Sequence, residues 1–169
     1  MASSASSSST NQDSELIFNY DRNPSWIYDV FLSFCDKDTS ESFQSNLYTA
    51  LTADGIVVYK DEDKLLNRDQ IITSSVLHAI EGSRLSIIVF SKIYADSTWC
   101  LQELEKITEC RRATGQIVVP VFYDVDLSDV LHQEDLLGEA SEYLKQTILK
   151  KDKLIREVCN ISGFAVHSR

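Results

Sequence analysis

Short apolar runs alternate with segments of helical periodicity along most of this chain. Four runs are rich in β-branched and aromatic residues and are predicted to be strands: 28–34, 56–59, 85–90 and 117–123. The third run, LSIIVF, is almost continuously apolar, which is typical of a parallel strand covered by helices on both faces. A fifth stretch, 161–166, is either a short strand or the start of a linker.

Between the strands, apolar residues recur at helical spacing and predict amphipathic helices. Asp38 is expected to cap the first helix, with Glu41 as its capping-box partner. Gly82 is expected to end the second helix, and Ser97 or Thr98 to begin the third. The apolar stripes consist of Phe43, Leu47, Ala50 and Leu51; of Ile72, Val76, Ala79 and Ile80; of Cys100, Leu104 and Ile107; and, in a long last helix, of Leu137, Ala140, Leu144, Ile148, Ile155 and Val158.

The alternation of strands and helices predicts a three-layer α/β sandwich, because parallel strands need right-handed helical crossovers. Its simplest form is flavodoxin-like, with a parallel sheet of four to five strands in the order 2-1-3-4-5. Pro120 cannot donate to a strand ladder, so the fourth strand is expected to have a free side at that position. The polar segments 60–69 and 124–136 are expected to be irregular, and the first of them exposed.

Composition and charge narrow the function classes. The formal net charge of −10 argues against nucleic acid as the main partner, since nucleic-acid binders carry basic patches. The four cysteines form no CxxC pair and no cluster with zinc-ligand spacing, so no metal is expected. A catalytic Cys–His pair stays open, although nothing favours it. The usual Gly-rich dinucleotide and P-loop motifs are absent, and no apolar run approaches the roughly 18 residues of a membrane span.

The segment 91–104 (SKIYADSTWCLQEL) has the greatest functional interest. It leaves a buried strand, turns through small polar residues and opens a helix with the carboxylate of Glu103 in its second turn. Open α/β folds bind ligands beside the carboxyl ends of their strands. An inward-facing Glu103 would indicate an enzyme, whereas an exposed Glu103, the commoner situation for a helical glutamate, would indicate a binding module.

Several longer motifs together resemble one family. YDVFLSF, the Asp38–Thr39 pair, NLYTAL, AIEGSRLSIIVFSKIYADSTWCLQEL and IVVPVFYDVDLSDV are similar to the motifs of plant Toll/interleukin-receptor (TIR) domains of intracellular disease-resistance proteins. The Ser-rich composition of the first residues predicts a disordered leader at 1–24. The resemblance implies a TIR domain at 25–166 and the start of a linker at 167–169. It also implies a cytoplasmic or nucleo-cytoplasmic location.

The same resemblance implies an enzymatic activity. Such domains cleave the nicotinamide–ribose bond of NAD+, which is then a substrate, and no cofactor is expected. The family's catalytic glutamate lies in the motif WCLxEL, which here is Glu103. The substrate-binding residues that the resemblance implies are Phe34, Cys35, Asp36, Trp99 and Arg68.

The resemblance further implies self-association with other TIR domains, in part through the first helix at Ser45 and Asn46. Several positions depart from the family pattern and favour an alternative, a catalytically weak TIR domain that acts as a homotypic interaction scaffold. A response-regulator receiver is set aside, because Ser91 and Lys92 stand where a receiver has an Asp. The departing residues are Asp36, Asn46, Asp69, Leu127 and Leu131.

Overall fold

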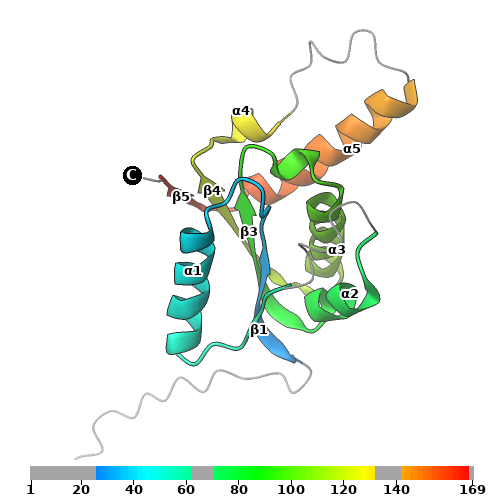
Figure 1. The fold of residues 1–169 in the computed structure, drawn as a ribbon. Coiled ribbons are helices and arrows are strands. Elements are labelled where there is room, and N and C mark those ends of the chain that lie inside the picture. The colour runs from blue at the N-terminus through cyan, green and yellow to red at the C-terminus, as the bar shows by residue number, and fades with distance from the viewer. Residues whose placement is uncertain (1–25, 62–70, 132–141, 168–169) are drawn as a thin grey trace, which may run out of the picture.

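The computed structural model describes residues 26–61, 71–131 and 142–167, and their strands form one parallel sheet in the order β2-β1-β3-β4-β5 (Figure 1). The predicted flavodoxin-like class and strand order are therefore confirmed. The fifth stretch is a strand, which pairs with β4 through Val121↔Phe164 and the next two residue pairs. The strands are β1 (Tyr28–Ser33), β2 (Val58–Tyr59), β3 (Ser83–Phe90), β4 (Ile117–Tyr123) and β5 (Phe164–Val166).

Alternation along the strands divides the core into two layers, one on each face of the sheet. On β1, Val30, Leu32 and Phe34 point towards the helix α1 (Glu41–Ala53), whereas Phe31 and Cys35 point to the opposite face. That opposite face is covered by α2 (Ser74–Glu81), α3 (Thr98–Thr114) and α5 (Glu142–Cys159). Figure 1 shows α1 on one side of the sheet and these three helices on the other.

Most helix boundaries follow the predicted capping signals, with one correction. Gly82 is the C-cap of α2, and the Ser97 hydroxyl accepts from the backbone N–H of Cys100 at the start of α3. The predicted Asp38 cap of α1 is wrong, because Ser40 occupies that position and accepts from the N–H of Phe43. The Asp38 carboxylate accepts instead from the backbone N–H of Ile93, 2.8 Å away, and joins the loops that follow β1 and β3.

Other differences from the predicted pattern are local. The stretch after β4 is not wholly irregular, because Leu127–Val130 forms α4, capped by Asp126 in a reciprocal capping box with Asp129. Ala50 is exposed rather than buried on the α1 stripe. Ile72 is buried but precedes α2. Most of the 60–69 loop lies outside the described residues, as do Leu137 and Ala140 of the predicted last helix. Asp61, the last residue described before the gap in this loop, is buried, although the loop was expected to be exposed.

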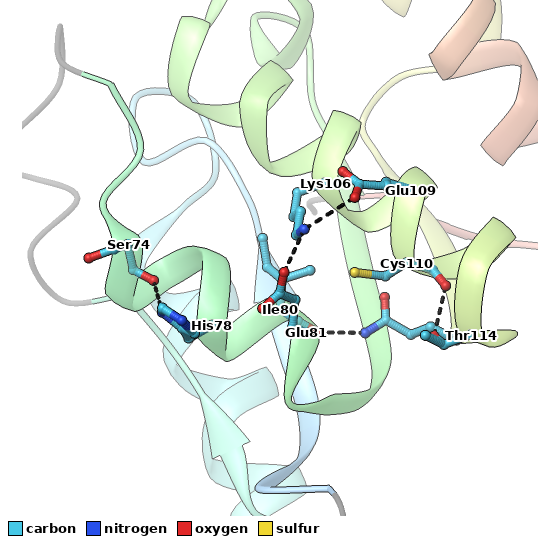
Figure 2. Close-up of polar contacts among 9 residues, drawn as sticks. Ser74, His78, Ile80, Glu81, Lys106, Glu109, Cys110 and Thr114 are labelled. Atoms are coloured by element: carbon cyan, nitrogen blue, oxygen red, sulfur yellow. Dashed lines mark hydrogen bonds and ion pairs between the residues drawn. The ribbon is translucent and has the colours of Figure 1, made fainter.

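The neighbouring helices α2 and α3 are joined by polar contacts as well as by the core. Lys106 of α3 forms an ion pair with Glu81 of α2 at 2.6 Å and a longer one with Glu109 at 3.4 Å (Figure 2). The hydrogen bond from the Lys106 side chain is the main reason that the pKa of Glu81 lies below its ordinary value. The side-chain amide of Gln116 donates to the carbonyls of Ile80 and Ser83, and these two hydrogen bonds fix the turn between α2 and β3.

Pro120 lies next to the ladder that joins β4 to β5. That ladder begins at Val121, one residue later, so no strand partner on that side requires an N–H from Pro120. Gly163, which precedes β5, passes so close to Pro120 that an added Cβ would lie 2.5 Å from the proline carbonyl oxygen and 2.8 Å from its Cγ. The close approach is possible only without a side chain.

Replacing Gly163 with alanine is therefore expected to displace β5 and to lower the free energy of unfolding by about 1–3 kcal/mol. Urea unfolding followed by circular dichroism measures the change. Ser162→Ala, one residue earlier and exposed, is the matched control and should leave stability unchanged. Equal stability of Gly163→Ala and the wild type would contradict the close packing of this edge strand.

Among the described residues, we find no helix with the length and apolar character that crossing a bilayer requires.

Candidate active site

The start of α3 positions Glu103 at the carboxyl end of β1. The Ser97 cap begins the helix six residues earlier, and Trp99, Cys100 and Ile107 share the buried face of α3 with Glu103. The Glu103 side chain is 0% exposed, although a glutamate of this kind is seldom fully buried. The interpretation of Glu103 as a solvated surface residue is therefore excluded, and an inward-facing carboxyl group remains.

Both carboxyl oxygens of Glu103 have hydrogen-bond partners. The Ser33 hydroxyl, at the end of β1, lies 2.5 Å from Oε2, and the Trp99 indole N–H donates to Oε1 at 2.9 Å. Trp99 precedes Glu103 by four residues, so the two side chains are neighbours on one helical face. The strand end and the helix thus hold the carboxyl group from two directions.

Tyr94 extends this hydrogen-bonded group. It lies in the short 3-10 helix η2 (Tyr94–Asp96) that follows β3, and its ring is fully buried against Phe90. Its hydroxyl lies 2.8 Å from the Ser33 oxygen and donates to the carbonyl of Cys100 at 3.2 Å. Burial, followed by the charges of Cys100 and Glu103, raises the pKa of Tyr94 well above its ordinary value. Tyr94 therefore keeps its proton at neutral pH.

The structure brings together only some of the predicted substrate-binding residues. Cys35 and Trp99 are buried on the same face of the sheet as Glu103. The Phe34 side chain lies on the other face of the sheet, in the layer under α1. Only the Phe34 backbone is near this site, where its carbonyl accepts from the Cys100 thiol at 3.5 Å. Asp36 is half-buried in the loop after β1. Arg68 lies outside the described residues, as does Asp69.

The predicted self-association residues Ser45 and Asn46 are both exposed on α1. Exposure is required of residues that contact another domain, but it is equally usual for a polar surface pair. Their role therefore stays a prediction.

Two residues of the site, Ser33 and Tyr94, are not among the site residues that the sequence predicts. A signal for Ser33 exists, because it is polar at an inward position of an otherwise apolar strand, YDVFLSF. Buried polar groups need partners, and the partner here comes from a helix 70 positions further on. Tyr94 carried no comparable signal, since buried tyrosines are common in cores.

Other buried oxygens occur at the same edge of the sheet. Thr39 Oγ1, Ser91 Oγ and one carboxylate oxygen of Asp38 are buried and have no hydrogen-bond partner among the described residues. They belong to the loops after β1 and β3, which the bond from Ile93 to Asp38 joins. Such groups are ordinarily satisfied by water or by a ligand.

A separate groove of about 180 Å³ lies between α3 and α5. Glu105 of α3 and Lys150 of α5, both among its lining residues, form an ion pair at 2.6 Å. Glu103 is not among the residues that line it. The groove is therefore distinct from the site at the end of β1.

The chemistry available to this site follows from its environment. An ionised carboxyl group in a buried site stabilises a nearby positive charge more strongly than it would in water. A neutral carboxyl group can instead donate a proton or a hydrogen bond. Glu103 can perform either function on a ligand that reaches the carboxyl edge of the sheet.

Comparison with known proteins gives one consistent family. The family model described as "TIR domain" matches residues 27–165. The chain is 45% identical over 141 residues, 81% of its length, to "Disease resistance protein RPV1" of Vitis rotundifolia, and 47% identical over 117 residues, 69% of its length, to "TMV resistance protein N" of Nicotiana glutinosa. It spans about a tenth of the length of each of these curated relatives, 10% in both cases.

A solved structure is similar over most of the chain. The TIR domains of the activated Roq1 resistosome, which directly recognises the pathogen effector XopQ, match with a TM-score of 0.71 and 43% sequence identity. The match covers 82% of this chain and 87% of that one.

Proposed function

Because this chain belongs to the TIR domain family, we propose that it is an innate-immune signalling domain that cleaves the nicotinamide–ribose bond of NAD+ when it self-associates. The disease-resistance relatives support the immune role, and the resistosome whose TIR domains it resembles supports assembly as the active condition. NAD+ is the substrate in this proposal, and no further cofactor is needed. The proposal places the domain in the cytoplasm.

The buried carboxyl group of Glu103 is the observation that carries this proposal. Breaking the bond between nicotinamide and C1′ of the ribose releases neutral nicotinamide and leaves a positive oxocarbenium-like sugar. An ionised carboxylate stabilises that charge, as in glycoside hydrolysis. Water then adds to C1′, and the products are nicotinamide, ADP-ribose and one proton. Nicotinamide leaves from a cationic state, so one carboxyl group suffices.

The burial of Glu103 also bears on how the activity would be controlled. A carboxyl group that is 0% exposed cannot touch a sugar that arrives from solvent. The edge of the sheet must open before the reaction, and contacts between copies of the domain are the proposed cause. A ligand or partner shifts such an equilibrium by binding one state better than the other.

Turnover per molecule is therefore expected to increase with protein concentration. Nicotinamide release is measured across a dilution series, with light scattering on the same samples to report self-association. The proposal expects the two curves to rise together. Turnover that is constant per molecule while the scattering mass increases would show that assembly does not control the reaction.

The alternative function, a homotypic interaction scaffold with weak catalysis, has one observation in its favour. Leu127 and Leu131, which depart from the family pattern, pack against the core instead of offering polar contacts at the surface. The family pattern has an Arg where this chain has Leu131, so one basic contact is missing. Strong self-association without nicotinamide release at any concentration would favour the scaffold.

A further inference from the structure

One face of the sheet is covered less completely than the other. The helices α2, α3, α4 and α5 all send side chains into the core layer on their face. In the opposite layer, α1 is the one described helix that contributes, through Phe43, Leu47 and Leu51 (Figure 1). This helix lies beside β2, and only its start reaches β4, where the Tyr123 hydroxyl bonds to Ser40 at 3.0 Å.

Five apolar side chains form a strip on the part of this face that α1 leaves open. Leu85 and Ile87 of β3 pair in register with Ile117 and Val119 of β4, and Phe164 of β5 lies on the other side of β4. Alternation along the strands directs all five towards the α1 layer. Ile117 is 49% exposed and Phe164 66%. Because neighbouring strands lie about 4.8 Å apart, the strip is roughly 10 Å wide, the diameter of one helix.

The side of α1 that borders the strip is also open. Tyr48 marks the other side of this helix, because its ring centroid lies 6.0 Å from the Lys60 ammonium, next to β2. Gln44 and Ala50 stand three residues before and after Leu47, at mirrored positions about the buried stripe. Gln44, on the side of Tyr48, is buried, whereas Ala50 is exposed. A second helix can therefore lie beside α1 at Ala50, on top of the strip.

The outward face of α1 is almost uncharged. Glu41, in the first turn, is the one charged residue among the 13 of this helix, in a chain of which 25% is charged. Protein interfaces are depleted in charged residues at their centre. A chain with a net charge of −10 repels a second copy unless the surfaces that meet are uncharged, and this surface meets that condition. Its exposed residues are small: Ser42, Ser45, Asn46, Thr49 and Ala53.

We propose that two copies of this chain associate through the strip and the outward face of α1, with α1 of each copy lying in the strip of the other about a two-fold axis. The strip alone, in which three of the five side chains are half-buried, offers on the order of 300 Å². A stable interface needs about 800 Å² from each partner, so the outward face of α1 must contribute. The inference rests on the self-association in the proposed function and does not depend on NAD+ cleavage.

Sedimentation velocity over a concentration series tests this interface. Phe164→Asp places a negative charge in the strip, and Thr49→Lys places a positive charge on the outward face of α1. Each variant is expected to weaken self-association at least about tenfold, because an unpaired charge is then buried in the interface. Leu149→Asp and Gln146→Lys make the same charge changes at exposed positions of α5, on the other face of the sheet, and should associate like the wild type.

An equimolar mixture of the two variants identifies the occupant of the strip. In the mixed dimer, the new lysine on α1 of one copy faces the new aspartate in the strip of the other, and the second contact between α1 and a strip stays native. The mixture should therefore associate more strongly than either variant alone. Ile117→Asp replaces Phe164→Asp in both measurements if circular dichroism shows that the latter displaces β5.

Two results would overturn the inference and leave the strip to a helix of another protein. One is a wild type that stays monomeric at every concentration, and the other is a mixture that associates no more strongly than its components. Nicotinamide release is measured on the same samples. Association through this surface without any nicotinamide release would contradict the proposed cleavage of NAD+ and leave the inference intact.

Discussion

Replacing Glu103 with alanine is expected to lower the rate of nicotinamide release by at least about 100-fold to 1000-fold, the usual cost of removing one preorganised group that stabilises transition-state charge. The carboxyl group is the acidic side chain that β1 and α3 hold between them at the carboxyl edge of the sheet. The rate is measured with purified protein at a concentration where it self-associates.

The matched control for this variant is Glu105→Ala. Glu105 lies two residues further along the same helix, is exposed and pairs with Lys150. An exposed ion pair contributes little, about 0–1 kcal/mol, so folding and turnover should both be close to those of the wild type. Glu103→Ala with normal turnover would remove Glu103 from the mechanism, and equal losses in both variants would indicate a general effect of altering α3.

Replacing Trp99 with alanine is expected to have the largest effect on stability, a loss of about 3–5 kcal/mol in the free energy of unfolding. Trp99 is 2% exposed and lies in the core between the sheet and α3, so its removal leaves a large cavity. The variant also removes the indole N–H that donates to Glu103 Oε1. Chemical unfolding measures the loss, with Trp26→Ala as the control because Trp26 is only half-buried.

Trp99→Phe separates the two contributions of this side chain. It keeps an aromatic ring in the core but cannot donate to the carboxyl group of Glu103. Turnover is therefore expected to fall, while the loss of stability is expected to be smaller than in Trp99→Ala. A loss of stability in Trp99→Ala no greater than in Trp26→Ala would contradict the packing described for α3.

The layout of the sheet could be predicted from the sequence because it follows from local patterns. The continuous apolar run of β3 and the stripes on α2 and α3 each favour one element, and the right-handed crossover rule leaves few ways to connect them. The N-cap of α1 could not be predicted from local sequence alone, because Asp38 and Ser40 are both favourable N-cap residues. The structure uses Ser40, since the Asp38 carboxylate accepts from the backbone N–H of Ile93, 55 positions away.

The candidate site could be predicted only in part, for a similar reason. Glu103 and Trp99 are four residues apart on one helix, so their contact follows from local geometry. Ser33 reaches Glu103, and Tyr94 reaches Ser33, through tertiary packing, across 70 and 61 positions, and no local spacing indicates such contacts. The family resemblance implies that Phe34 binds substrate, but the two-residue period of the strand directs its side chain to the opposite face.

The most direct measurement of the central claim is the release of nicotinamide from NAD+ by the purified wild-type domain, followed by chromatography at its highest soluble concentration. The account predicts many molecules of nicotinamide per molecule of protein, with ADP-ribose or a further ADP-ribose product in equal amount. Intact NAD+ after prolonged incubation with the folded, self-associated domain would contradict it.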